Sequence, residues 1–438
     1  MNMEKIEYQY KNSYTGIFSL NYFIQGLNTS MFVTVVPIYI LSTFGTINQA
    51  AIAFMLSILL IPATIKLLYG ILTDKFAFKK FGRRKPWIIF SSCFSGIIWF
   101  IIPFIMPSTS AGAITLFTIS GFFISIGMFM SDTATDGFIL DSCPKEKLGR
   151  VQGFCWGLRA IGIIAGGPAI LLILVYLPIE LLFTTLGILM IIFSLFTLLI
   201  PIMQHDKEIA IIPNLKLIFK RSENWKVFSF SFFSSIGGGV VAAFVSLYIL
   251  IQAGFVSPEG ANLSSLDDTS LYEPQAFISF LISLGIFAGA IIGGLVADKK
   301  SRRTALFLSV GLTTSSLVLL LLPVSVPILL FFAFFVGLAN GWGFASFTAI
   351  AAEYSQQYPD FDSSYYSICV SFVNFGTVIG FIFTGIMFST VTRTITDIRV
   401  IYGIIFIAMA ISYILILIPL LLMDRQQYEF KLTDSLST

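Results

Sequence analysis

The sequence contains a series of long apolar segments separated by short polar loops, and this pattern limits the possible folds more than any other feature. A helix needs roughly 20 apolar residues to cross the hydrocarbon core of a bilayer. Twelve segments meet that length, approximately at 15–41, 50–73, 87–107, 111–140, 150–176, 179–203, 225–252, 274–297, 304–324, 326–352, 365–389 and 399–423. We therefore predict an all-α membrane protein with twelve transmembrane helices.

The composition agrees with a membrane environment. Of the 438 residues, 56% are hydrophobic and 11% are charged, whereas about a quarter of the residues in soluble domains are charged. The four cysteines are scattered, mostly within apolar segments, and predict neither a disulfide framework nor a metal site. The polar N-terminus has no cleavable signal pattern, so we expect the first apolar segment to be retained as a span.

The distribution of lysine and arginine predicts the orientation in the membrane. The N-terminus, the loops that follow even-numbered segments and the C-terminal tail carry most of the 26 basic residues. By the positive-inside rule, both termini are cytoplasmic. The loop at 353–364 is cytoplasmic by parity and yet has acidic residues and no basic one, but acidic residues carry little weight in this rule. We expect a multi-pass protein of the cell membrane.

A mixed polar and apolar stretch between the sixth and seventh segments divides the chain into halves. The predicted units are an N-terminal six-helix half at 1–203, a cytoplasmic linker at 204–224, a C-terminal six-helix half at 225–423 and a cytoplasmic tail at 424–438. Within the linker, Ile211–Phe219 has the pattern of a short amphipathic helix. The single histidine, His205, is interpreted as a solvated residue of this linker.

An aspartate at the end of an apolar segment, followed by a short turn with two arginines, occurs once in each half. Such an aspartate can cap a neighbouring helix while it pairs with arginines of its own loop. Because the pattern recurs, we interpret it as a cytoplasmic gate, or latch, rather than a solvated loop. The predicted gate residues are Gly70, Asp74, Gly82, Arg83, Arg84, Asp298, Arg302 and Arg303.

Four charged residues lie within the apolar segments of the first half. Lys66 is about 12 Å from the end of its segment, and Asp132 and Asp136 are spaced to share one helix face. Arg159 lies at a similar depth in the fifth segment. A charge at this depth costs a few kcal/mol, so each must be paired or must face a watery cavity. We expect Arg159 to pair with Asp132 or Asp136, which leaves Lys66 freer.

Three interpretations of these charges remain open. They can be structural ion pairs that brace helices near the gate. Lys66, with or without Arg159, can offer positive charge to an anionic substrate group. A desolvated aspartate can take up and release a proton as the driving ion.

The second half has only uncharged polar candidates at membrane depth, namely Asn340, Trp342 and Asn374. They can line a cavity or make hydrogen bonds between helices. Gln25 and Asn28 in the first segment are candidates of the same kind. Glycines spaced four apart in the fifth and eighth segments indicate close helix packing, and either a static contact or a moving interface between the halves explains them.

The twelve-segment plan and the paired loops resemble the major facilitator superfamily over essentially the whole chain. That resemblance implies two pseudosymmetric six-helix bundles around a central cavity, and transport by alternating access. The stretch from Pro62 through Lys66 and Asp74 to Trp87, together with Asp132-Thr-Ala-Thr-Asp136, is similar to the branch of muropeptide permeases and acetyl-CoA transporters. Folate-biopterin carriers share the Lys66-to-Asp74 stretch. Gly149–Arg159 looks more like glycoside-cation and light-harvesting-associated carriers.

The first of these resemblances implies a secondary transporter for a small anionic or amphipathic solute, with proton coupling in the bacterial members. We expect a monomer. One alternative is a symporter or facilitator of the sugar or glycoside-cation type. An alternative of another class is a non-transporting sensor or assembly factor built on a carrier fold. The sequence has no catalytic set at membrane depth, so we expect no enzyme activity, no cofactor, no metal and no nucleic-acid partner.

Overall fold

A computed structural model describes residues 10–76, 81–201, 211–256, 270–358 and 362–429. Across these ranges the chain forms helices joined by turns, and eleven helices are long and apolar enough to cross a membrane. The ninth predicted span corresponds to α14 (Arg302–Leu319), which packs against its neighbours in the bundle but begins with two arginines. The prediction of an all-α, twelve-helix membrane protein is therefore confirmed.

The first half of the chain forms six membrane-spanning helical rods, several of them interrupted. Their elements are α1 (Asn12–Ser30), η1 (Met31–Val35), α2 (Val36–Phe44), α3 (Gln49–Thr64), α4 (Lys66–Lys75), α5 (Lys85–Ile101), η2 (Ile102–Ile105), α6 (Ser110–Ser142), α7 (Lys145–Ile164), η3 (Ala165–Ala169), α8 (Ile170–Leu174), α9 (Ile179–Leu195) and η4 (Phe196–Leu199).

The helix α10 (Ile211–Lys220) precedes the second half and confirms the short helix predicted in the linker. His205 lies outside the described residues. The elements that follow are α11 (Ser222–Phe233), α12 (Gly238–Gln252), α13 (Tyr272–Lys299), α14 (Arg302–Leu319), α15 (Val326–Ser355), α16 (Asp362–Val391), α17 (Ile398–Leu415), α18 (Leu417–Leu422) and η5 (Arg425–Gln427).

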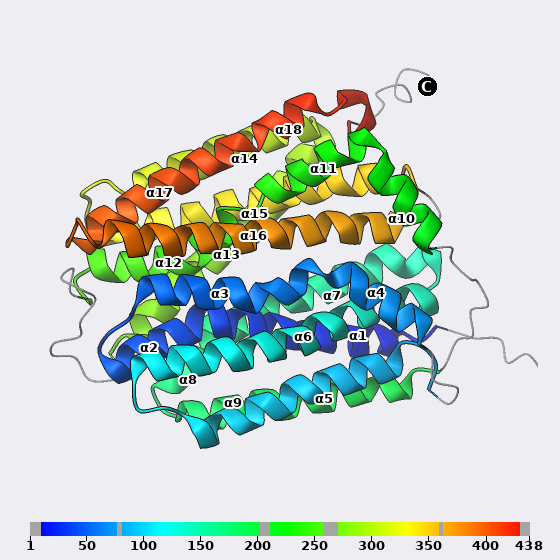
Figure 1. The fold of residues 1–438 in the computed structure, drawn as a ribbon. Coiled ribbons are helices and arrows are strands. Elements are labelled where there is room, and N and C mark those ends of the chain that lie inside the picture. Colours follow the sequence, from blue (N-terminus) through cyan, green and yellow to red (C-terminus); the bar gives the residue numbers. More distant parts are fainter. Residues whose placement is uncertain (1–9, 77–80, 202–210, 257–269, 359–361, 430–438) are drawn as a thin grey trace, which may run out of the picture.

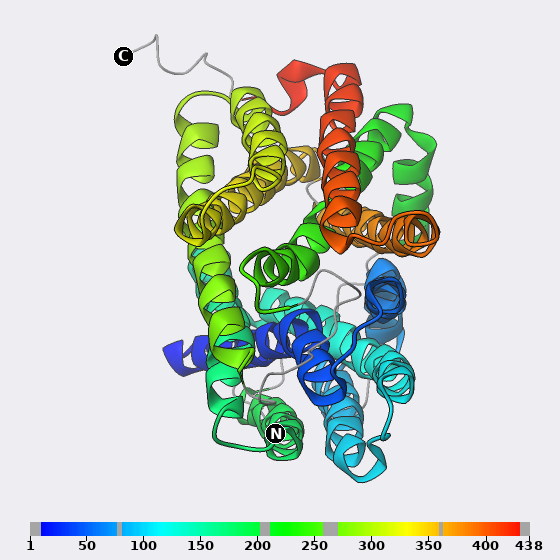
Figure 2. The same ribbon diagram turned by 90° about the vertical axis from the view of Figure 1, so that its left-hand side faces the viewer.

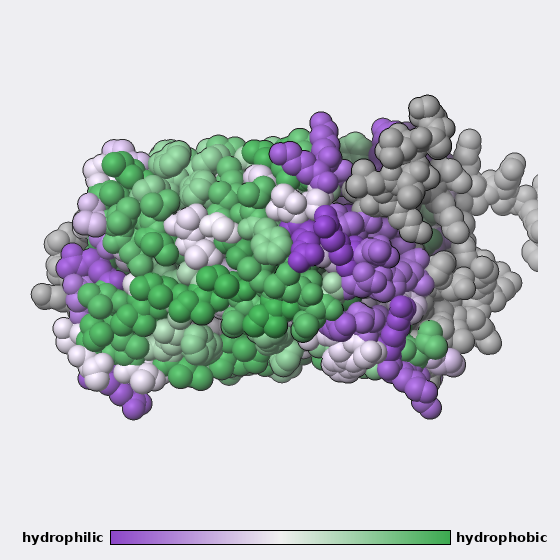
Figure 3. Space-filling model, turned by 90° about the horizontal axis from the view of Figure 1, so that it is seen from above, coloured by the Kyte–Doolittle hydropathy of each residue, from purple (hydrophilic) through white to green (hydrophobic). Residues whose placement is uncertain are grey.

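The helices run roughly parallel, with those of residues 12–199 below those of residues 222–427 in Figure 1. The helix α10, the C-terminal ends of α4, α6 and α13 and the N-terminal ends of α5, α7 and α14 lie at one end, which we call the basic end. On the face seen in Figure 3, a belt of hydrophobic side chains lies between hydrophilic ends. This belt is the surface that faces lipid.

Several contacts between the two groups of helices lie toward the end opposite the basic end. Ser42 and Tyr272 share a hydrogen bond of 2.8 Å there, and Gly385 lies directly against the ring of Phe54. The helix α13 also contacts η3 and α8, and Figure 2, which views this end, shows α13 extending beside the first-half helices. The two groups are thus joined at that end.

Two proline-associated interruptions shape the helices that carry charges. Pro62 lies inside α3, which ends at Thr64, and after a break at Ile65 the chain resumes as α4 at Lys66. Pro168 lies in the π-helical segment η3, which separates α7 from α8. The apolar segments had predicted both helices as uninterrupted.

Candidate functional site

The four charged residues predicted at membrane depth come together in one cavity between the two groups of helices. The cavity has a volume of about 190 Å³. Its lining residues from the first half are Lys66, Phe129, Asp132, Asp136, Trp156 and Arg159, and those from the second half are Phe344, Phe347, Tyr366, Ser367, Val370, Val373 and Asn374. All of the charge therefore comes from one half, and the other half contributes aromatic and uncharged polar groups.

Asp132 is the centre of this charge cluster. It is only 2% exposed, and its carboxylate accepts a hydrogen bond from the Lys66 ammonium. The Arg159 guanidinium lies 3.8 Å from the second carboxylate oxygen. The expectation that Arg159 would pair with an aspartate is confirmed, but the expectation that Lys66 would be freer is wrong. The break at Ile65 places Lys66 at the start of α4, from which its side chain reaches α6.

Asp136 has a different kind of partner. It accepts a hydrogen bond from the hydroxyl of Tyr22 on α1, and among the described residues no basic side chain forms a salt bridge with it. Gln25, one turn further along α1, accepts a hydrogen bond of 3.5 Å from Arg159. Tyr22 was not predicted from the sequence. Its spacing of three residues from Gln25 was the available signal, because this spacing puts both residues on one helix face.

Trp156 and Phe344 lie opposite each other across the cavity. Their ring centroids are 6.4 Å apart, and the Arg159 guanidinium lies 5.0 Å from the centre of the Trp156 ring. Phe344 is 50% exposed although it lies in the middle of α15. Both rings are thus available to a bound molecule. Neither was predicted, because aromatic residues are abundant throughout the chain and carry no positional signal.

A second cavity of about 250 Å³ lies within the second half and shares Phe344, Phe347 and Val373 with the charged one. Its polar lining is uncharged: Ser234, Ser235, Ser309, Thr313, Asn340, Thr377 and Tyr413. The Tyr413 hydroxyl is buried and has no hydrogen-bond partner among the described residues. The structure thus places Asn340 at a cavity wall.

The other two uncharged candidates have identifiable contacts. Trp342 donates a hydrogen bond of 2.9 Å to the carbonyl of Ala305 and packs against Gly293, so it joins helices within the second half. Asn374 donates a hydrogen bond of 3.1 Å to the carbonyl of Ala63 across the two halves and also lines the charged cavity. Asn28 accepts a hydrogen bond of 2.6 Å from Trp99 and is a packing residue.

In the first predicted gate, Arg83 and Arg84 both donate hydrogen bonds to Asp141, which lies at the end of α6. Arg83 donates hydrogen bonds of 2.5 and 3.0 Å to the Asp141 carboxylate. Arg84 donates to Thr73 at 2.6 Å and packs directly on Gly137, where any side chain would collide with the guanidinium. The side chain of Asp74 lies outside the described residues. Gly82 has φ of 76° and permits the tight turn.

The second predicted gate has a different pairing from the expected one. Arg302 donates to Glu353 at 2.6 Å and to the carbonyl of Tyr428 at 2.9 Å. Asp298 is exposed, and among the described residues it forms no salt bridge with Arg302 or Arg303. Glu353, which was assigned to the acidic loop from the sequence, lies in the last turn of α15. It pairs with the arginine because Arg302 points into the bundle, where it is 7% exposed.

Comparison with known proteins places this geometry in context. A model of the Major Facilitator Superfamily matches residues 18–270 and 227–431. The chain is 26% identical over 265 residues to a Rickettsia conorii protein named as transporter AmpG 1, covering 58% of this chain and 60% of the relative. It is 28% identical over 150 residues to a protein of Arabidopsis thaliana named as folate-biopterin transporter 4, covering 34% of this chain and 30% of that one. These matches span less than two thirds of the relatives' lengths.

Solved structures share the fold over nearly the whole chain. The nucleoside transporter NupG aligns with a TM-score of 0.69 at 15% identity, covering 93% of this chain and 98% of its own. The xylose transporter XylE from E. coli, in an inward open conformation, aligns with a TM-score of 0.63 at 13% identity, covering 91% and 94%. At this identity the likeness concerns the fold alone.

Proposed function

Since the chain belongs to the Major Facilitator Superfamily, we propose that it is a secondary transporter that moves a small anionic solute across a membrane by alternating access. The observation that carries this proposal is the position of the charge cluster. Lys66, Asp132, Asp136 and Arg159 line a cavity whose other wall comes from the second half of the chain. A charge cluster that only braced one half would not need to border the interface between both.

The balance of charge in the cavity favours an anion together with a proton. With both carboxylates ionised, the two cations and two anions cancel. Protonation of Asp136 breaks no salt bridge, because its partner is the Tyr22 hydroxyl, whereas protonation of Asp132 would weaken its contacts with Lys66 and Arg159. Protonation of Asp136 leaves the cavity with one net positive charge. An anionic group is then attracted to Lys66 and Arg159, which couples the two species.

The adjoining uncharged cavity limits the solute further. Its hydroxyl and amide groups, with Asn340 and Tyr413 among them, fit the neutral polar part of a molecule whose anionic end lies against Lys66. The rings of Trp156 and Phe344 offer stacking surfaces between these two regions. Folate, which appears in the name of one relative, combines carboxylates with a polar ring system and is one member of this class.

The contacts at the end opposite the basic end support a particular state of the cycle. Ser42 with Tyr272, and Phe54 with Gly385, join the halves there. In this proposal the described state is closed at that end and corresponds to the inward-facing one, with the basic end cytoplasmic. Opening toward the outside then requires these contacts to separate while the basic end closes.

A thermal-shift screen of the detergent-purified protein tests the proposal. The panel contains nucleotides, acyl-CoAs, amino-sugar peptides, folate and pterins, and neutral sugars. A ligand at a hundred times its dissociation constant stabilises the folded protein by about 2.7 kcal/mol. We expect an anionic compound to stabilise the wild type and Lys75→Ala, which removes an exposed lysine of the same helix, but not Lys66→Ala.

Stabilisation by a neutral compound that does not depend on Lys66 would contradict an anionic solute. A neutral sugar that stabilises the wild type and Lys66→Ala equally would favour a transporter of the sugar type, which remains the second candidate because of the uncharged cavity around Asn340. The charge cluster would then be assigned to bracing or coupling.

A further inference from the structure

A cavity of about 520 Å³ lies away from the charge cluster, between α1 and α7 near the basic end. Two features of these helices explain the opening. Gly26 and Gly162 allow the backbones to cross so closely that a side chain on either would collide with the other helix, whereas Gly16 has no atom within 4 Å of where a side chain would begin. The helices are therefore in tight contact at mid-membrane, and toward the basic end, where Ser19 and Cys155 still lie 3.7 Å apart, the exposed side of Gly16 leaves the cavity open.

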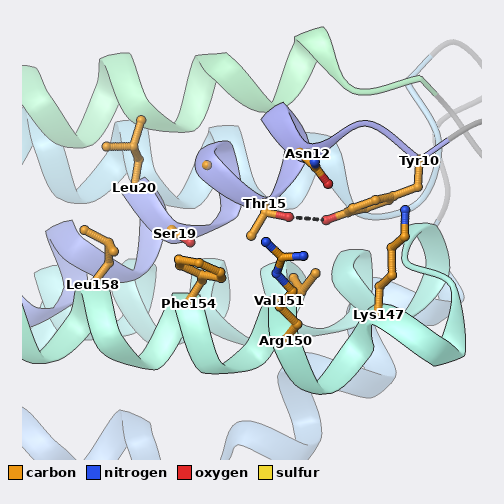
Figure 4. Close-up of a pocket in the computed structure, with 11 residues that line it drawn as sticks. Tyr10, Asn12, Thr15, Ser19, Leu20, Lys147, Arg150, Val151, Phe154 and Leu158 are labelled. Carbon is orange, nitrogen blue, oxygen red and sulfur yellow. Dashed lines mark hydrogen bonds between the residues drawn. The ribbon is translucent and has the colours of Figure 1, made fainter.

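The cavity is polar at its outer part and apolar further in. Figure 4 shows Tyr10, Lys147 and Arg150 toward one end of the cavity and Leu20 and Leu158 toward the other. The outer group lies where the predicted spans begin, at Asn12 and Arg150. A molecule that fits this gradient has a polar headgroup at the membrane boundary and apolar chains directed into the bilayer.

The charge of the outer part specifies the headgroup. Lys147 and Arg150 are exposed, and among the described residues neither forms a salt bridge with a carboxylate. Their cationic groups lie 5.8 Å from the centres of the Tyr10 and Phe154 rings, respectively. The Asn12 side chain and the Thr15 hydroxyl add uncharged polar groups to the same wall. Two cations with adjoining polar groups complement a phosphate that carries negative charge.

We propose that this cavity binds an anionic phospholipid of the leaflet at the basic end, with its phosphate on Lys147 and Arg150 and its acyl chains along Leu20 and Leu158. Binding of this kind involves residues outside the charge cluster. It therefore holds or fails independently of which solute the protein moves.

The test is a titration of the full-length, detergent-purified protein with phosphatidylglycerol and with phosphatidylcholine, followed by native mass spectrometry. We expect preferential binding of phosphatidylglycerol to the wild type. Since each basic residue near an anionic headgroup contributes about fivefold in affinity, the double variant Lys147→Gln with Arg150→Gln should bind phosphatidylglycerol about 30-fold more weakly. Gly16→Leu, which fills the cavity without a change of charge, should also weaken binding.

The matched control is Lys299→Gln with Lys300→Gln, which removes two exposed basic residues at the same end of the molecule but outside the cavity. This variant should retain the wild-type affinity. Equal binding of the two lipids would overturn the proposal, as would an equal loss in the control. Displacement of the lipid by millimolar inorganic phosphate would overturn the acyl-chain part. If the double variant Lys147→Gln with Arg150→Gln does not fold, Gly16→Leu decides the test: binding of phosphatidylglycerol as strong as in the wild type would overturn the proposal.

Discussion

At the scale of single residues, the two aspartates of α6 lie on one helix face and yet have different surroundings. Asp132 contacts two cations, whereas Asp136 contacts the Tyr22 hydroxyl. The difference arises from the helices opposite each aspartate, since α4 and α7 supply the cations and α1 supplies the tyrosine. We therefore assign the ion-pair role to Asp132 and propose Asp136 as the proton site.

This assignment predicts opposite outcomes for two isosteric substitutions. Asp136→Asn should fold normally and still exchange solute across the membrane, but it should no longer accumulate solute in response to a pH gradient. Asp132→Asn leaves two cations without their carboxylate and should destabilise the protein by about 3–5 kcal/mol. Uptake in proteoliposomes and thermal unfolding in detergent measure the two effects. Loss of folding in Asp136→Asn would instead assign both aspartates to bracing.

The site was predictable from the sequence only where chemistry made residues conspicuous. Lys66, Asp132, Asp136 and Arg159 stand out because charge is costly in lipid, and the structure places them together. Their pairing was not predictable, because the break at Ile65 determines where Lys66 points. Trp156 and Phe344 gave no signal among 46 phenylalanines and 5 tryptophans, since which aromatic residue faces a cavity depends on helix rotation.

At the scale of elements, the glycines of α7 fall into two groups that the sequence spacing did not separate. Gly162 lies so close to the carbonyl of Phe23 on α1 that a side chain would collide with it, whereas Gly153 and Gly157 have no atom within 4 Å of a side-chain position. Gly162 therefore serves static packing against α1. Gly153 and Gly157 lie in the part of α7 nearer the basic end. There α7 has room to approach another helix in a different state of the transport cycle.

The same substitution at two positions of α7 separates these roles. Gly162→Leu should lower the free energy of unfolding by about 1–3 kcal/mol through overpacking against α1. Gly157→Leu should leave the thermal midpoint within the range of the wild type, because the added side chain meets open space. It should nevertheless slow solute uptake, since the leucine obstructs closure at the basic end. Equal unfolding curves for both variants would contradict the packing role of Gly162.

The described contacts of the gate arginines reach beyond the repeated loops. Both halves have an aspartate followed by two arginines, yet Arg302 pairs with Glu353, and Arg83 pairs with Asp141. The arginines reach acidic residues at the ends of neighbouring helices, which lie far away in the sequence. The repeat therefore did not predict the pairs with Glu353 and Asp141, whereas the predicted pairing of Asp74 falls on a side chain outside the described residues.

At the scale of the whole molecule, the number of helices followed from the apolar segments, because span length is set by bilayer thickness. The cavities did not, since they depend on how the halves meet. In the proposed cycle the halves are joined through Ser42 and Tyr272 at one end, and the charged cavity communicates alternately with each side. A sensor or scaffold with the same fold has no need of two-sided access.

Two-sided access can be measured without knowledge of the solute. Phe344 lines both cavities, so Phe344→Cys is introduced into a protein in which the four native cysteines are replaced by serine or alanine, after its folding is verified. A membrane-impermeant maleimide is then applied to vesicles of either orientation. We predict labelling from both sides, faster from the basic end. Labelling from one side only, at every pH and with every solute of the panel, would contradict alternating access and favour the non-transporting alternative.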